Sequence, residues 1–321
     1  MTVPYFWRLL CLCLGAFFLV HLAAGFAVVR FSRPAIRWAS RMRASRAATF
    51  LLILRLLPSA IALIAVAGLC APSFLLLEPR ATSEEVGFGF LAAAFLGAAI
   101  WVAAAWRAAS AVRSLVRCQR YFRRKGRQER VAGDSVLVLQ EESPFLGLAG
   151  LFRPRMVVSQ TVLTSLAPEE LQTAMAHERA HLASRDNLKR LVLLLAPDPL
   201  PMWRGLEPIE SAWRRFTEWA ADDGAVNGDS GRSVSLAAAL VRVARLSGKA
   251  VASPRITPLL ADSSELADRV NRLLASAPSA PAGRTWSLPL LASAAIFVTV
   301  FATRQPAALN WVHSTLERLL H

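Results

Sequence analysis

The sequence predicts a multi-pass α-helical membrane protein that carries one α+β domain on the cytoplasmic side. Hydrophobic residues make up 55% of the 321 positions, and the mean hydropathy is +0.40. That composition is too apolar for an ordinary soluble domain. The apolar residues fall into four long runs, and arginines cluster beside them. These observations indicate membrane spans arranged around a soluble domain.

Three of the apolar runs predict three transmembrane helices within residues 1–106, because each run is long enough to cross a bilayer. We expect these spans near 5–29, 48–77 and 86–106. The basic loop at 30–47 contains no acidic residue, so the positive-inside rule assigns it to the cytoplasm and the N-terminus to the outside. Arg55 lies in the second run, and we expect its side chain to snorkel to the interface.

The rest of the chain predicts a soluble domain between two membrane regions. Residues 107–130 are basic and predict a juxtamembrane helix that continues from the third span. The composition from Val131 onward predicts a soluble domain over 131–275. A Pro/Ala/Ser linker at 276–285, a fourth transmembrane helix at 286–304 and a short external tail at 305–321 complete the expected organisation.

Within the soluble domain the pattern predicts two strands and several helices. The strands are expected at 135–140 and 155–159, with an apolar loop or bent hairpin at 143–150 between them. Further on, the turn-rich segment 224–232 is expected to be a loop before an Ala-rich helix. The apolar residues 191–195 are too few to span a bilayer, so they form either a core helix or a segment against the membrane surface.

A single short motif carries the chemistry. Within Met175–Asp186, His177 and His181 enclose Glu178 in the pattern H-E-x-x-H. Pro168 and two following glutamates predict the start of a helix, and helical residues four apart share one face. Both imidazoles can therefore reach one metal ion, with Glu178 beside them to polarise a water, which is typical of zinc hydrolases.

The third metal ligand is expected to be a carboxylate. A catalytic zinc takes three protein ligands, and these must lie on one side of the membrane, which excludes His21 and His313. No cysteine lies near the motif. Glu218 is the best candidate, with Asp222 on the same helical face to bond the far nitrogen of a ligand histidine. The alternative is a solvated acidic patch that includes Asp223.

These motifs resemble the M56 family of membrane zinc metallopeptidases, the BlaR1/MecR1-type peptidase domain, which is related to the M48/HtpX group. The resemblance rests on H-E-x-x-H followed by Arg185-Asp186, and on Glu218-x-x-Ala-Asp222. Weaker matches are the strand segment 150–159 and Leu266-Ala-Asp-Arg269-Val. Because only a short tail follows the last span, we expect a stand-alone peptidase without the external penicillin-sensor domain of the antibiotic sensors.

The resemblance implies a zincin-like (gluzincin) fold over about 131–275 and one catalytic Zn²⁺. It implies that His177, His181 and Glu218 bind the zinc, that Glu178 is the general base, and that Asp222 supports a ligand histidine. The donor to the oxyanion stays open among Arg185, Asn187 and Arg269, and for Arg185 and Arg269 structural ion pairs are the alternative role.

We therefore expect a zinc endopeptidase of the cell (inner) membrane, with a cytoplasmic peptidase domain and external termini. Its partners would be the lipid bilayer and a protein or peptide substrate, either a cytoplasmic regulator such as a transcriptional repressor or a membrane protein. The strand at 155–159 is expected to bind substrate by strand addition.

Three other functions compete with this reading. The chain could be a non-catalytic membrane signalling or scaffold protein with a latent or structural zinc site, or an HtpX-like quality-control protease. A DNA-binding regulator is suggested by the net charge of +15. We expect no nucleic-acid partner, because the arginines lie beside apolar runs, where they orient membrane helices.

Overall fold

A computed structural model describes residues 4–78, 87–141, 143–200, 204–249 and 263–275, with a few positions between 305 and 314. The expected linker at 276–285, the fourth span at 286–304 and most of the tail lie outside the described residues. The described chain is mostly helical and contains a small mixed sheet, which confirms the expected fold class.

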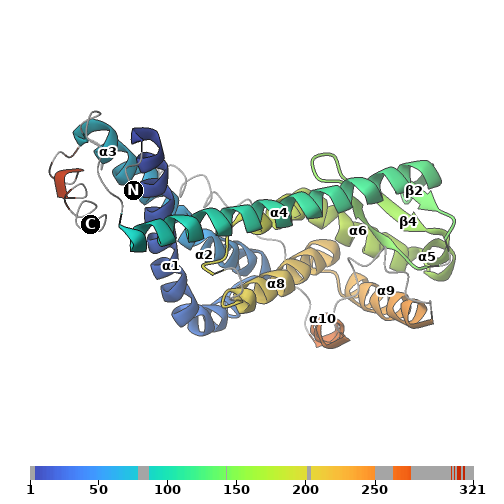
Figure 1. The fold of residues 1–321 in the computed structure, drawn as a ribbon. Helices are drawn as coiled ribbons and strands as arrows, with labels where there is room; N and C mark the ends of the chain where they lie inside the picture. The colour runs from blue at the N-terminus through green and yellow to red at the C-terminus, as the bar shows by residue number, and fades with distance from the viewer. Residues whose placement is uncertain are drawn as a thin grey trace.

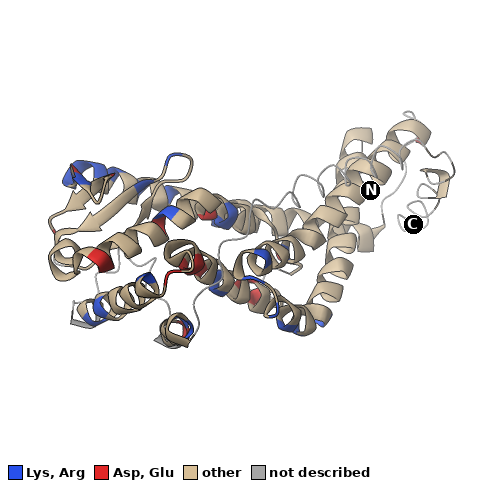
Figure 2. Ribbon diagram, turned by 180° about the vertical axis from the view of Figure 1, so that it is seen from behind, with Lys and Arg blue, Asp and Glu red and all other residues tan. Residues whose placement is uncertain are grey.

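Three long apolar helical runs form one end of the molecule (Figure 1). The first is α1 (Tyr5–Ala39). The second is α2 (Ala44–Ala65), which continues through a π-helical turn at Val66–Cys70 into α3 (Ala71–Leu77). The third is α4 (Phe88–Lys125). Each run is long and apolar enough to cross a membrane. The end near the N-terminus is almost free of charged residues in Figure 2.

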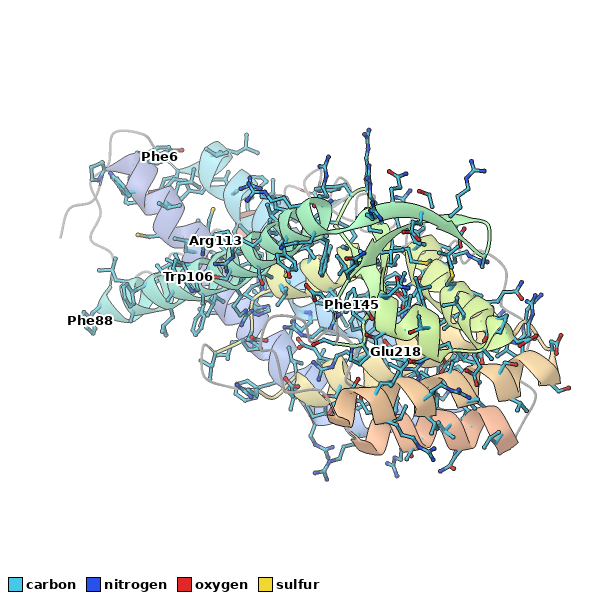
Figure 3. The ribbon with its side chains drawn as sticks, turned by 90° about the vertical axis from the view of Figure 1, so that its right-hand side faces the viewer. Phe6, Phe88, Trp106, Arg113, Phe145 and Glu218 are labelled. Atoms are coloured by element: carbon cyan, nitrogen blue, oxygen red, sulfur yellow. The ribbon has the colours of Figure 1, made fainter. Side chains whose placement is uncertain are left out.

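Helix α4 joins this apolar end to the sheet at the opposite end of the molecule. Figure 3 shows Trp106 and Arg113 along α4, between Phe88 at the apolar end and Phe145 near the sheet. The basic helix expected at 107–130 therefore continues from the third span as predicted, but it ends at Lys125.

The predicted helical character of the last five residues of that segment is wrong, because Arg127–Val131 forms strand β1. This strand turns at Ala132 and Gly133, which both have positive φ, and pairs antiparallel with β2 (Asp134–Leu139). An edge strand with four exposed polar residues lacks the apolar alternation by which strands are recognised. The folded domain thus begins at Arg127, ahead of Val131.

The sheet has the order β1-β2-β4-β3, with β3 at Leu146–Ala149 and β4 at Arg155–Ser159. Strands β2 and β4 are parallel, and both outer pairs are antiparallel. Both predicted strands are confirmed, but the expected loop at 143–150 contains β3. Because β2 and β3 pair with both sides of β4, the prediction that a substrate strand adds to 155–159 is wrong.

Both faces of the sheet are buried. Val136 and Val138 of β2 point toward α6 and α9, whereas Leu137 and Leu139 point toward Phe122 at the end of α4. The helices that follow the sheet are α5 (Gln160–Ser165), α6 (Pro168–Ser184), α7 (Asp186–Leu195), α8 (Glu207–Val226), α9 (Ser230–Lys249) and α10 (Ser263–Ala275). The loop expected at 224–232 is only a short turn at 227–229, because α8 continues to Val226.

Helix α8 packs directly against the apolar helices. Ile209, Trp213 and Phe216 of α8 share one core with Leu51 and Leu52 of α2. Helix α7 contacts α2 and α4, so the apolar segment 191–195 is a helix packed against the apolar helices.

The connection after α7 also reaches the apolar helices. A Cβ on Gly25 of α1 would lie 2.4 Å from the ring of Pro199, so only glycine allows this close approach. Arg55 does not snorkel to the interface as expected. It is 1% exposed, with Nε 2.6 Å from Glu210 of α8 and Nη2 2.7 Å from Asp198 in the connection between α7 and α8, so the packing of these segments supplies two carboxylates to it.

Candidate metal centre

Helix α6 presents the H-E-x-x-H motif to the interior of the domain. Pro168 occupies its first turn, and the carboxylate of Glu170 accepts a hydrogen bond from the N–H of Ala167. The helix ends at Arg185, which adopts a left-handed conformation with φ 55°. His177 is 4% and Glu178 is 5% exposed, so both side chains face the core.

Helix α8 supplies the acidic residues of the centre. Glu218 and Asp222 lie four residues apart and therefore on one face of α8. A Cβ on Gly224 would lie 3.1 Å from the Cβ of Ala180, which shows how closely α8 and α6 approach each other. This close packing brings the carboxylate of Glu218 to the two histidines, in the interior position that Figure 3 labels.

The three predicted ligands form one cluster. Nε2 of His177 lies 3.1 Å from Nε2 of His181, and the Glu218 carboxylate lies 3.5 Å from the first and 3.7 Å from the second. Ligands at 2.0–2.1 Å from a tetrahedral zinc would be about 3.3 Å apart. The described residues contain this one group of three metal-ligating side chains, and its donor set of two imidazoles and one carboxylate fits a catalytic zinc.

Each histidine also has a carboxylate at its other ring nitrogen. Nδ1 of His177 lies 2.9 Å from Asp222, and Nδ1 of His181 lies 2.8 Å from Asp186. Such contacts hold the rings in the tautomer whose Nε2 lone pair is free to bind a metal. Sequence reasoning assigned no role to Asp186, which follows the left-handed Arg185 and is directed back to His181 by that turn.

Arg269 of α10 binds the acidic side of the centre. Its Nε and Nη2 donate to the two oxygens of Asp222 at 3.0 and 2.6 Å, and Nη1 lies 3.0 Å from Glu218. Asp222 is fully buried and Arg269 is 5% exposed. Of the two roles left open for Arg269, this geometry supports the structural ion pair.

The other two candidate donors lie elsewhere. Arg185 is exposed at the junction of α6 and α7 and makes no ion pair with the described residues. Asn187 donates its amide hydrogen to the carbonyl oxygen of Gly150 at 2.9 Å. Neither side chain contacts the histidines within the part of the chain that the structure describes.

The electrostatics of the centre favour a cation. Burial lowers the pKa of His181, but the carboxylates of Asp186 and Glu218 have a larger, opposite effect and raise this pKa to about 10. Burial raises the pKa of Glu218, and the two imidazoles outweigh this effect and bring it well below its usual range. With neutral imidazoles, helices α6, α7 and α8 contribute four carboxylates, whose charge Arg269 and Lys189 offset only in part. A divalent ion would neutralise the remaining negative charge.

A small apolar pocket adjoins the motif. Its lining includes Glu178 and Arg269, together with Leu146 of β3 and Leu240 and Val243 of α9. Burial raises the pKa of Glu178, with smaller opposing effects from the two histidines. Glu178 thus lies between the polar cluster and an apolar cavity, and the helix α9 that forms much of this cavity had no predicted role in the site.

Comparison with known proteins agrees with this architecture. The family model described as BlaR1 peptidase M56 matches residues 79–273, which is more than half of the chain. No curated protein and no solved structure shows a significant match. The family consists of membrane-associated metallopeptidases, in agreement with the three apolar helices and the His-His-Glu cluster. The chain belongs to the M56 peptidase family.

Proposed function

We propose that this protein is a membrane-embedded, zinc-dependent endopeptidase. The observation that carries the proposal is the convergence of His177, His181 and Glu218, whose ligand atoms all lie within 4.8 Å of one another beside Glu178. A general base next to a three-ligand cluster supports a catalytic site over a structural zinc site, which needs no base.

His177, His181 and Glu218 would hold the ion, and we infer zinc because two imidazoles and one carboxylate are a common catalytic zinc set. When bound, zinc lowers the pKa of a water molecule toward about 7 and polarises the scissile carbonyl. Asp222 and Asp186 orient the two imidazoles, and Arg269 holds Asp222 and Glu218 in place.

Glu178 is the proposed general base. Its carboxylate accepts a proton from the attacking water and then delivers that proton to the leaving amine. The raised pKa of this buried carboxyl suits both roles, because a base that must return its proton works best with a pKa near the operating pH.

The substrate is proposed to bind as an extended strand along β3. In the described part of the chain, β3 is the last strand of the sheet and pairs only with β4, so its outer edge is available for backbone hydrogen bonds. Leu146 of β3 also lines the apolar pocket beside Glu178, so we infer that this pocket takes an apolar substrate side chain.

The proposed topology has a cytoplasmic peptidase domain and an external N-terminus. The supporting observation is the arginine-rich segment at 30–46, which lies at the same ends of α1 and α2 that pack against α8. The substrate would then be a cytoplasmic regulator, such as a transcriptional repressor, or a membrane protein reached from the cytoplasmic side. The C-terminus would be external if the fourth span forms as the sequence predicts.

Proteolysis by the purified full-length protein and its Glu178→Gln variant tests the proposal, with casein and the protein itself as substrates and the metal content measured in parallel. We expect cleavage by the unmodified protein, its loss in the variant, and equal zinc in both. Zinc without cleavage in either protein would support the signalling or scaffold alternative.

A further inference from the structure

A second cavity, separate from the metal centre, lies where the apolar helices meet the catalytic domain. Its volume is about 710 Å³, and α2, α4, α7 and α8 all contribute side chains to it. This volume falls in the range of about 300–1,000 Å³ that is typical of small-molecule sites. The residues of the metal cluster are not among those that line it.

The cavity is rich in arginine. Five arginines and three carboxylates line it, which leaves an excess of positive charge. Arg107 and Arg214 are paired with carboxylates, and Arg55 is paired through two of its nitrogens. Arg190 and Arg204 are exposed and make no ion pair within the described chain.

Arg55 has one unused donor. Its side chain is 1% exposed, and Nη1 finds no hydrogen-bond acceptor among the described residues. A buried guanidinium nitrogen without an acceptor costs free energy unless a ligand or water supplies one. This nitrogen is itself closed off from solvent, so Arg55 adds a buried positive charge to the cavity wall, and Arg190 and Arg204 are the arginines whose donors are open to a ligand.

The position and the walls of the cavity indicate what kind of anion it binds. Arg107 lies where the apolar run of α4 ends, and Val112 and Leu115 continue the same helix along the cavity wall. Leu194 of α7 and Trp213 of α8 add further apolar surface. An arginine-rich pocket between helices at the membrane boundary suits a lipid phosphate, because the guanidinium fork matches phosphate oxygens and the apolar wall can contact an acyl chain.

We propose that this cavity binds the headgroup of an anionic phospholipid, with the phosphodiester held by Arg190 and Arg204 and attracted by the buried charge of Arg55. The proposal concerns a binding site and does not depend on catalysis, so it can fail or succeed independently of the proposed peptidase function.

The test is native mass spectrometry of the full-length protein titrated with phosphatidylglycerol or phosphatidylcholine. The variant Arg190→Gln/Arg204→Gln removes the two unpaired arginines. The matched control is Arg127→Gln/Arg130→Gln, which makes the same change in charge on exposed positions of β1, away from the cavity. If each lost arginine contact weakens binding about fivefold, phosphatidylglycerol should bind about 30-fold more weakly to the first variant. The control should bind like the unmodified protein.

Two further arms decide what the ligand is and guard against misfolding. Inorganic phosphate is added as a competitor, and Leu115→Glu introduces a carboxylate into the cavity wall by an independent route. A preference for phosphatidylglycerol that survives phosphate and is weakened by both cavity variants supports the proposal. Equal binding of both lipids, equal binding by the cavity variants and the control, or displacement by millimolar phosphate would overturn it.

Discussion

Substitution of Asp186 should weaken metal binding, although Asp186 is not itself a ligand. Its carboxylate accepts a hydrogen bond from His181 at 2.8 Å, and a second oxygen lies 2.8 Å from Nζ of Lys189. Asparagine keeps the shape and an acceptor oxygen but loses the charge. A hydrogen bond to a charged group is worth about 1–1.5 kcal/mol more than a neutral one, so Asp186→Asn should reduce zinc affinity about tenfold.

Removal of the acceptor carboxylate of Asp186 should reduce zinc affinity more than loss of its charge. Asp186→Ala leaves the His181 ring without its orienting partner, and losses for such supporting carboxylates reach about 100-fold. Zinc affinity is measured by competition with a chromophoric chelator, and circular dichroism checks that the helices are intact. Asp134→Asn, which removes a charge from a more exposed ion pair with Arg179, is the control and should bind zinc normally. Unchanged zinc affinity in Asp186→Ala would show that Asp186 does not support the metal site.

Three further predictions concern stability and catalysis. Arg55→Gln should lower the free energy of unfolding by about 2 kcal/mol, because it removes the buried cation that pairs with the partly buried carboxylates of Glu210 and Asp198. Arg214→Gln in an exposed pair should lower it by at most about 1 kcal/mol, and thermal unfolding in detergent compares the two variants. Gly25→Ala should cost about 1–3 kcal/mol through overpacking, and Gly89→Ala, which has no neighbour within 4 Å, should cost nothing measurable by the same method. Glu178→Gln should slow casein cleavage at least about 100-fold with zinc retained, and a variant that cleaves normally would exclude Glu178 as the base.

Local sequence signals were sufficient for the elements that depend on local physics. Helix α6 has the start that Pro168 and its two glutamates predicted, and the strand at Arg155–Ser159 has the predicted bounds. The spacing of His177 and His181 predicted two donors on one face, and their Nε2 atoms do face each other. Each of these features is determined by the geometry of a few consecutive residues, so the local sequence was enough to predict it.

Features that depend on tertiary structure were missed or predicted wrongly. Strand β1 is polar because it lies at an exposed edge, so no apolar alternation marks it. Arg55 was expected at the interface, but its partners Asp198 and Glu210 lie more than 140 residues further along the chain. The contact of Asp186 with His181 depends on the left-handed conformation of Arg185. This conformation could not be predicted, because the position is not occupied by glycine or asparagine, which usually adopt it.

The assignment of Glu218 depended partly on local sequence and partly on tertiary structure. Spacing alone left it as a candidate beside the possibility of a solvated patch, since a helix 37 residues downstream can pack in many ways. The resemblance to the M56 family supplied the pairing, and the close contact between Gly224 and Ala180 gives its physical basis. The strand edge at β3 and the apolar wall from α9 could not be identified earlier, because they require the strand order and the helix packing.

Zinc dependence is tested most directly by titrating metal-depleted protein with zinc and measuring the return of peptidase activity. We expect no cleavage after chelation and full recovery of activity at one zinc per chain. Glu218→Gln should need far more zinc and recover little activity, because it removes the only carboxylate of the proposed ligand set. Cleavage that persists after complete removal of the metal would show that the protein is not a zinc peptidase, and full recovery in Glu218→Gln at the same zinc concentration would exclude Glu218 as a ligand.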